Sequence, residues 1–358
     1  MKEIGQELRR KALARERLSP EEAVTLLTEA PLHGLGALAH EIRAGWHGDK
    51  AFMAANRHVN YTNICTSRCS FCSYRADAGV AGAFLLKPRE AAATLREGGM
   101  DGITELHIVG SLAPAEMAGF SYYLELLRAL RDAFPGVSLK AFTAVEVAWM
   151  AKLADKPVEK VLAELKAAGL DAMPGGGAEI FAEEVRREIC ARKIGGEEWL
   201  SVHRAAHKLG IPTNATMLYG HIERPEHIAD HLLRLYDLQA ETGGFQAFVP
   251  LPYQPWDGGL ACAGNTGVDD LRVLAASRIV LGNVPHIKAY WIGFGLKLAQ
   301  VMLHWGADDL DGTIGSERIF HAAGAKTPAG VTLDALAAII KGAGLRPVLR
   351  DALYRELN

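Results

Sequence analysis

The stretch NICTSRCSFCSYRAD, residues 63–77, places three cysteines within eight positions of one another. Cys65, Cys69 and Cys72 follow the spacing Cys-x3-Cys-x2-Cys, whereas the other two of the five cysteines stand alone in the sequence. An odd total with one tight group favours metal binding by reduced thiols over a framework of disulfides.

Strand-like and helix-like segments alternate along the chain around this stretch. The first strand-like segment, HVNYTNI at 58–64, is rich in β-forming residues and runs directly into the cysteines. Further strands, with helical patterns between them, are expected at 103–111, 137–144, 170–177, 211–220, 245–251, 285–291 and 308–314. Eight strand–helix units in order imply parallel strands and predict a closed (β/α)8 TIM-type barrel of the α/β class. An open doubly wound sheet is the alternative, because it requires only one miscounted strand.

The rest of the chain is expected to consist of helices packed on this barrel. Residues 1–54 predict an N-terminal helical segment, in which Ser19 is a helix N-cap followed by Pro20. The barrel is assigned to residues 55–311, and residues 312–358 are expected to form a helical C-terminal extension packed on it. A length of 358 residues suits an α/β barrel that folds as one unit.

The composition excludes several classes of protein. The formal net charge is −3, so the chain has no excess of positive charge for binding nucleic acid or anionic membranes. The charged N-terminus lacks the apolar core of a signal peptide, and no stretch of about 18 uninterrupted apolar residues predicts a membrane span. We therefore expect a cytoplasmic protein whose partners include neither nucleic acid nor membrane.

The cysteine stretch is expected at an active site. Barrel enzymes build their sites at the carboxyl ends of the strands, and this stretch follows the first expected strand. Three thiolates on one short loop fill three of the four iron positions of a cubane cluster and leave the fourth iron open. A zinc site would need a fourth ligand from elsewhere, such as His107 or His221. A metal-binding protein without catalysis, or three thiols with no shared role, are further alternatives.

Cys65, Cys69, Phe71 and Cys72 resemble the Cys-x3-Cys-x-aromatic-Cys signature of radical S-adenosylmethionine enzymes. The resemblance implies a [4Fe-4S] cluster held by the three cysteines, with S-adenosyl-L-methionine bound at the open iron. Longer segments, among them GLDAMPGGGAEIF and NATMLYGH, resemble the aminodeoxyfutalosine synthase family of the futalosine route to menaquinone. Cyclic dehypoxanthine futalosine synthase and the synthase that joins tyrosine to a deazaflavin precursor are close relatives of that family.

The second resemblance implies a transferase that forms a carbon–carbon bond. It would add the 5′-deoxyadenosyl radical to 3-[(1-carboxyvinyl)oxy]benzoate and form 6-amino-6-deoxyfutalosine with loss of CO2. The implied partners are this aromatic carboxylate and a low-potential electron donor such as flavodoxin or ferredoxin. Where the family usually carries Gly-Gly-Leu-His-Pro, this chain has GSLAP at 110–114, with Ala113 in place of the histidine. This departure leaves open a related radical enzyme with another substrate, such as cyclic dehypoxanthine futalosine synthase.

The remaining candidate residues fall near the carboxyl ends of the expected strands or on nearby segments. The expected cofactor-binding residues are Tyr74, Gly110, Ser111, Glu146, Gly177 and Glu179. Glycines permit close approach of the backbone, and a carboxylate accepts hydrogen bonds from ribose hydroxyls. The candidate catalytic residues are His203, Asn214, Tyr219, His221 and Lys288. Lys288 is the expected partner of a substrate carboxylate, and because alternate strand residues face inward, only one parity of each strand can line the site.

Overall fold

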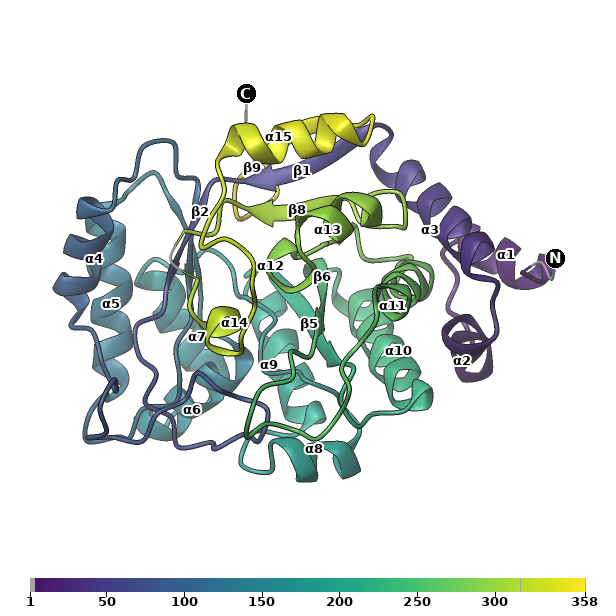
Figure 1. Ribbon diagram of the computed structural model, residues 1–358. Helices are drawn as coiled ribbons and strands as arrows, with labels where there is room; N and C mark the ends of the chain where they lie inside the picture. Colours follow the sequence, from purple (N-terminus) through teal and green to yellow (C-terminus); the bar gives the residue numbers. More distant parts are fainter. Residues whose placement is uncertain (1–3, 316, 358) are drawn as a thin grey trace.

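The computed structural model describes residues 4–315 and 317–357 and shows an α/β fold with mostly parallel strands (Figure 1). Within these residues the strands are β1 (Lys50–Ala54), β2 (Asn56–Val59), β3 (Glu105–Ile108), β4 (Ser138–Ala141), β5 (Thr213–Tyr219), β6 (Phe245–Pro252), β7 (His286–Ile287), β8 (Asp309–Gly312), β9 (Arg346–Arg350) and β10 (Glu356–Leu357). Each strand predicted from the sequence overlaps one of these except 170–177, where the structure has only single bridges. Pro174 and three glycines in that segment explain why it pairs so briefly.

The strands form three sheets, in the orders β10-β9-β1-β8, β2-β3-β4 and β5-β6-β7. Neighbouring strands run parallel except β9 and β10, which are antiparallel. Single bridges outside the named pairings join Lys140 to Ala172, Met173 to Thr213, Lys288 to Asp309 and Arg57 to Gly315. The predicted α/β class and parallel order are therefore confirmed, while the closed barrel stays a prediction.

Strands at both ends of the chain correct the expectation of purely helical flanking segments. β1 lies within the segment 1–54, and β9 and β10 lie within 312–358. β9 pairs with β1 along its whole length, and this pairing buries Val348. Pro347 has no N–H to continue a helix and Val348 is β-branched, so this segment extends along β1 instead.

Helices cover the outer faces of the sheets (Figure 1). Their bounds are α1 (Gln6–Leu13), α2 (Pro20–Thr28), α3 (Leu32–His47), α4 (Pro88–Glu97), α5 (Phe120–Ala133), α6 (Ala144–Ala154), α7 (Val158–Ala167), α8 (Glu183–Ile189), α9 (Gly196–Lys208), α10 (Pro225–Thr242), α11 (Gly267–Val280), α12 (Trp291–Phe294), α13 (Leu296–Met302), α14 (Ile319–Ala322) and α15 (Leu333–Gly342). Ser19 caps α2 as predicted, because its Oγ accepts the N–H of Glu22 at 3.2 Å. Among the described helices, none is both long and apolar enough to cross a membrane.

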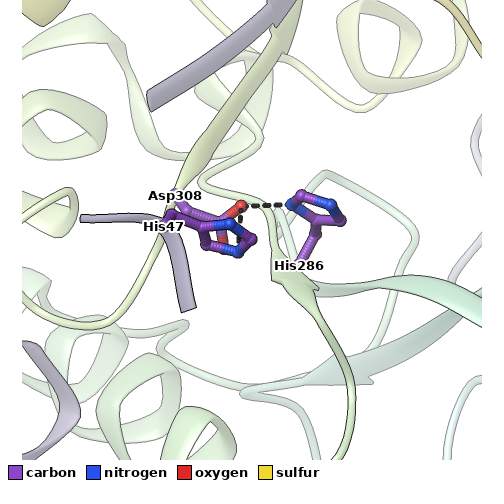
Figure 2. A group of neighbouring side chains, drawn as sticks. All are labelled: His47, His286 and Asp308. Carbon is purple, nitrogen blue, oxygen red and sulfur yellow. Dashed lines mark hydrogen bonds and ion pairs between the residues drawn. The ribbon is translucent and has the colours of Figure 1, made fainter. Parts of the chain in front are cut away.

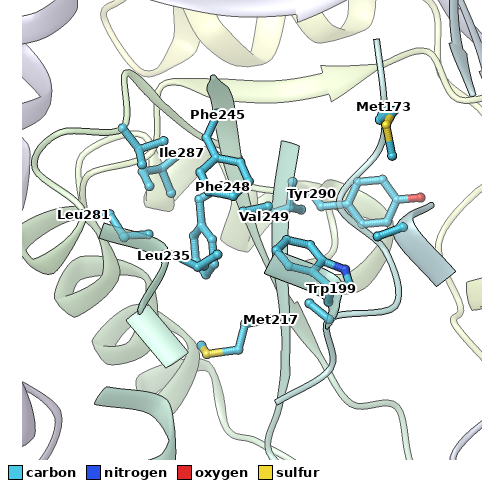
Figure 3. Close-up of a cluster of buried hydrophobic side chains, with 14 of the residues drawn as sticks. Met173, Trp199, Met217, Leu235, Phe245, Phe248, Val249, Leu281, Ile287 and Tyr290 are labelled. Atoms are coloured by element: carbon cyan, nitrogen blue, oxygen red, sulfur yellow. The ribbon is translucent and has the colours of Figure 1, made fainter. Parts of the chain in front are cut away.

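The hydrophobic core lies between the sheets and these helices. Figure 3 shows its part around β6, where Phe245 and Phe248 lie near Trp199 of α9 and Leu235 of α10. Burying one such side chain stabilises the fold by roughly 1.5–3 kcal/mol. Val249, the next residue on β6, belongs to the same cluster and also lines a cavity. The strand therefore lies between the core and the site described next.

Candidate active site

A cavity of about 320 Å3 opens at the carboxyl ends of the strands, where barrel enzymes carry their active sites. Its walls come mainly from strands β2, β3, β5, β6 and β8, from the loops at the carboxyl ends of the strands and from α14. The predicted site residues that line it are Cys65, Cys69, Cys72, Tyr74, Gly110, Ser111, Glu146, Gly177, Glu179, Asn214 and Lys288. Residues separated by more than two hundred positions in the chain thus meet around one space of the size that small-molecule sites have.

The cysteine loop is held against the rest of the molecule by backbone hydrogen bonds. The N–H of Cys65 donates to the carbonyl of Ala76 at 3.1 Å, which closes the loop on itself. The N–H of Ser70 donates to the carbonyl of Ile189 at 3.0 Å, which ties the loop to the end of α8. All three cysteines are free thiols. The loop therefore presents three unpaired sulfurs to the cavity from a fixed backbone.

The surroundings of two of these thiols favour the neutral, protonated form. Burial raises the pKa of Cys69 to about 12 and also raises the pKa of Cys72. Thiols in such surroundings become thiolates only beside a metal or another strong positive charge.

Lys193 supplies a positive charge beside the cysteine loop, and sequence reasoning missed it. Its Nζ lies 2.5 Å from Oε1 of Glu179 and 5.2 Å from the ring centre of Phe71. Burial opposes the charge, but the neighbouring Cys69 and Glu179 raise the pKa of Lys193 well above its ordinary value. Glu179 has φ of +49°, a strained conformation for a residue other than glycine and one that often marks functional sites.

Glu146 fixes the backbone of the loop after β3 rather than leaving a free carboxylate in the cavity. Its Oε1 accepts the O–H of Tyr61 at 2.5 Å and the N–H of Gly110 at 3.0 Å. Its Oε2 accepts the N–H and the O–H of Thr143, both at 2.7 Å, at the start of α6. A Cβ at Gly110 would lie 2.5 Å from the Tyr61 ring, so this position requires glycine. Both oxygens of Glu146 are thus occupied by the protein.

In the loop at 110–114, which departs from the family pattern, some residues line the cavity and others are buried in the core. Ser111 lines the cavity, whereas Ala113 is fully buried outside the set of lining residues. The carbonyl of Ala113 accepts the indole N–H of Trp149 on α6 at 3.0 Å. The N–H of Thr66 donates to the carbonyl of Leu112 at 3.0 Å, which joins this loop to the cysteine loop. Within this structure the alanine therefore packs under the loop.

The floor of the cavity is polar and carries buried ion pairs. Nζ of Lys288 on β7 lies 3.2 Å from Oδ2 of Asp311 on β8, and both residues line the cavity. Beneath them, Arg350 of β9 pairs with Asp309 at 2.7 Å and with Glu105 at 3.2 Å. His58 and His107 also line the floor, and their rings stack with centres 4.6 Å apart.

Three predicted catalytic residues are not brought to the cavity. His203 is fully buried on α9, its ring centre lies 3.8 Å from that of Trp199 with the planes tilted by 37°, and it shares a hydrogen bond with Thr213. The O–H of Tyr219 donates to Asp270 of α11 at 2.8 Å, on the other side of β5 from the cavity-lining residues. The His221 side chain is buried against Glu223 at 2.9 Å. Strand parity and the packing of α9 direct these side chains toward helices and loops.

Several residues that line the cavity carry a buried polar atom that has no hydrogen-bond partner among the described residues. They are Nδ1 of His58, Oγ of Ser67, Oγ of Ser73, the hydroxyl of Tyr74 and Oδ1 of Asn214. Buried polar atoms are rarely left without partners in native proteins, because each unpaired atom is costly. Such a concentration in one cavity indicates that bound ligands complete these hydrogen bonds.

Figure 2 shows a second group of metal-ligand types, His47, His286 and Asp308, near the opposite ends of the strands. The two imidazole rings stack 4.5 Å apart and only 12° from parallel. A metal lies in the plane of each imidazole that binds it, and two such parallel planes do not meet between the rings. The guanidinium of Arg278 also lies 2.5 Å from the Asp308 carboxylate. The group is therefore a hydrogen-bonded tie between α3, β7 and β8.

Comparison with known proteins places the chain among relatives that match nearly its whole length. A model of the radical SAM superfamily matches residues 59–235, and a model of the CofH/MqnC C-terminal region matches residues 242–358. The chain is 49% identical to aminodeoxyfutalosine synthase of Thermus thermophilus, covering 97% of this chain and 94% of that protein. It is 41% identical to aminodeoxyfutalosine synthase of Streptomyces coelicolor, with coverage of 99% and 94%.

Two further comparisons define the wider group. The chain is 41% identical to 5-amino-6-(D-ribitylamino)uracil--L-tyrosine 4-hydroxyphenyl transferase of Methanopyrus kandleri, covering 89% of this chain and 88% of that protein. Its fold superposes on the crystal structure of methylornithine synthase with a TM-score of 0.75 at 16% identity, covering 95% and 97% of the two chains. The second likeness concerns the fold alone.

The cysteine loop, the cavity beside it and the superfamily match define a radical S-adenosylmethionine enzyme, which uses a [4Fe-4S] cluster and S-adenosylmethionine. The free thiols and the unpartnered polar atoms of the cavity fit these groups. Within the superfamily, the chain belongs to the aminodeoxyfutalosine synthase family. Both resemblances seen in the sequence are thus confirmed.

Proposed function

We propose that the enzyme joins the adenosyl group of S-adenosylmethionine to 3-[(1-carboxyvinyl)oxy]benzoate and forms 6-amino-6-deoxyfutalosine with loss of CO2, in menaquinone biosynthesis. The observation that carries the proposal is a single cavity with three thiols at one end and Lys288 with unpartnered polar atoms at the other. The identity with two aminodeoxyfutalosine synthases supports the same substrate. One space that holds both reactants allows their reacting carbons to meet without diffusion.

We propose that Cys65, Cys69 and Cys72 hold the cluster. When bound, the cluster supplies the single electron that cleaves S-adenosylmethionine to methionine and the 5′-deoxyadenosyl radical. Tyr74, Ser111 and the backbone at Gly110 and Gly177 face the space beside these cysteines, and we assign them to S-adenosylmethionine. Glu146 keeps the Gly110 backbone in place through its four hydrogen bonds.

At the other end of the cavity we assign Lys288 and Asn214 to the aromatic substrate. Lys288 offers a cation for a carboxylate, and the unpartnered amide oxygen of Asn214 offers an acceptor. Tyr290 and Phe320 line the same cavity with rings 5.3 Å apart, and they supply apolar surface for an aromatic ring. These side chains orient the double bond and exclude water from a reactive radical.

The closed barrel is supported by the bridges that link the three sheets. Ala172 and Met173 join β4 to β5, Lys288 and Asp309 join β7 to β8, and β8 pairs with β1. β1 and β2 are separated by a single residue, and we infer that together they fill one strand position between β8 and β3. We propose that they form one (β/α)8 barrel, which extends the expected bounds of 55–311 to include β1 and the end of β8, with the rest of residues 1–54 and 312–358 packed on it.

We propose a cytoplasmic location, because a cluster loop needs reduced cysteines and all five cysteines are free. We also propose a low-potential electron donor such as flavodoxin or ferredoxin, because the cluster must be reduced before it can supply its electron.

The fate of the adenosyl carbons tests the proposed reaction. With reductant, S-adenosylmethionine labelled in the adenosyl group and the carboxyvinyloxy-benzoate, the label is expected in a product that also contains the benzoate ring. Methionine and CO2 should form in equal amounts with it, because an enol ether held at C5′ offers a π-bond for addition and no hydrogen to abstract. Mass spectrometry measures the products. Label almost wholly in free 5′-deoxyadenosine, with the benzoate unchanged, would contradict the proposal.

Glu179→Gln is expected to weaken S-adenosylmethionine binding while leaving the iron content intact. The change keeps the shape of the side chain but removes the charge that pairs with Lys193 at 2.5 Å, so a buried ammonium loses its partner. We expect the dissociation constant of S-adenosylmethionine to rise about tenfold or more, measured by equilibrium binding to cluster-loaded enzyme. Glu188→Gln is the control, because Glu188 is exposed on α8. Equal binding by both variants would remove Glu179 from the cofactor site.

A further inference from the structure

His58 and His107 form a stacked pair on the cavity floor, and neither residue has a role in the proposed function. They lie opposite each other in the register of β2 and β3, with ring planes 22° apart. The His58 side chain is buried, and its Nδ1 has no hydrogen-bond partner among the described residues. The His107 side chain is 23% exposed. The pair therefore lines the cavity with one partly exposed imidazole and one buried imidazole that has an unpartnered nitrogen.

The fixed charges around this floor already balance one another. Lys140 pairs with Glu105 at 3.1 Å, Arg350 pairs with Asp309 at 2.7 Å, and Lys288 pairs with Asp311 at 3.2 Å. Three buried cations thus face three buried carboxylates. A substrate with two carboxylates would add negative charge to a buried region, where an unbalanced charge is strongly unfavourable.

We propose that the His58–His107 pair is the second anion subsite of the cavity, which binds one carboxylate of the substrate and takes up a proton as it does so. The inference rests on the proposed function, since it requires a substrate with two carboxylates. Lys288 then binds the other carboxylate. One stacked pair accepts one proton, because two adjacent imidazolium rings would repel each other.

The surroundings of His58 explain why the proton arrives with the substrate. Burial, helped by the nearby His107 and Lys288, lowers the pKa of His58 to about 3, although Asp311 and Glu105 favour its charged form. The imidazole is therefore neutral in the free enzyme. A bound carboxylate supplies the missing counter-charge and raises the pKa of the complex above that of the free enzyme. Binding is then strongest below the pKa of the complex and weakens as the pH rises through it.

Titration calorimetry of cluster-loaded enzyme tests this inference without turnover. The substrate is titrated with S-adenosylmethionine present and reductant absent, in two buffers of different ionisation enthalpy. We expect uptake of up to one proton per bound substrate at about pH 5, because a bound carboxylate raises the His58 pKa by roughly 1–3 units from about 3. The dissociation constant should rise up to about tenfold per pH unit above the pKa of the complex. The methyl ester of the carboxyvinyl group, with one carboxylate, should bind with little proton uptake.

His58→Gln and His107→Gln separate the subsite from a structural role. Each is expected to weaken substrate binding about tenfold, and His58→Gln to make it nearly independent of pH, while the cluster absorption is unchanged. His304→Gln is the control, because that histidine is exposed and its Nε2 meets the Ala343 carbonyl far from the floor. If the substrate binds without proton uptake, or if both cavity variants take up a proton as the wild-type enzyme does, the subsite proposal is wrong and the proposed function still stands. No binding of the dicarboxylate by the wild-type enzyme would overturn the proposed function as well.

Discussion

Replacing Cys69 with alanine is expected to abolish both the iron content and the activity of the enzyme. Cys69 is buried on a loop whose ends are fixed by hydrogen bonds, so no other side chain can take its place. Anaerobic wild-type protein should contain about four irons and four sulfides per chain, the composition of a cubane cluster. In the Cys69→Ala protein, iron analysis should fall close to zero and the visible absorption should disappear. Cys65→Ala and Cys72→Ala should behave alike.

The two remaining cysteines provide matched controls for that result. Cys190 is buried at the end of α8, and the Sγ of Cys262 contacts the Gly220 carbonyl at 3.6 Å, outside the cavity-lining set. Cys190→Ala and Cys262→Ala should keep iron, sulfide and absorption. One zinc per wild-type chain and no sulfide would end the radical mechanism for this enzyme.

Lys288→Met is expected to raise the KM for the aromatic substrate by roughly 30- to 1000-fold, the effect of removing one partner of a buried charge pair. Lys288 faces the cavity and is only 2% exposed, so its ammonium meets a ligand with little competition from water. Methionine keeps the length of the side chain and leaves the packing of β7 nearly unchanged. Steady-state kinetics with saturating S-adenosylmethionine measure the change, and the KM for S-adenosylmethionine should stay close to wild type.

Lys140→Met is the matched control for Lys288→Met. Lys140 is also a buried lysine paired with a carboxylate, but it lies outside the set of residues that line the cavity. Its removal leaves Glu105 with Arg350 and should lower the melting temperature without a comparable rise in KM. Similar KM values for the two variants would show that Lys288 acts through stability rather than by binding substrate.

The sequence predicts the fold well where local patterns decide the structure. Alternating strands and helices identified the parallel α/β arrangement, and Ser19 marked the start of α2, because both depend on neighbouring residues. β1 and β9 could not be predicted in this way. Each is short, and each is a strand because the other, almost three hundred residues away, pairs with it.

The sequence predicts those parts of the site that a cysteine spacing or a glycine-rich turn marks. The cysteines form a motif, and the glycines before Glu179 mark a close approach of two backbones, since a Cβ at Gly175 would lie 2.6 Å from Ala215. Lys193, His58 and His107 belong to no motif and become site residues only through tertiary contacts. His203 and Tyr219 were predicted as catalytic residues, but both lie outside the cavity. Each side chain forms a hydrogen bond with a buried neighbour on the side away from the cavity, and the sequence pattern does not distinguish that arrangement from a catalytic one.

The pairing of Arg350 with Glu105 spans 245 positions of the chain, and it has a consequence for synthesis of the enzyme in the cell. A ribosome adds about 5–20 residues per second, so Glu105 is made on the order of 10 to 50 seconds before its guanidinium partner exists. During that interval the nascent chain contains carboxylates that will be buried, but not yet all of the cations that will pair with them. The polar interior can therefore close only late, after β9 has left the exit tunnel, and the nascent chain is open to chaperones and cluster-delivery proteins until then.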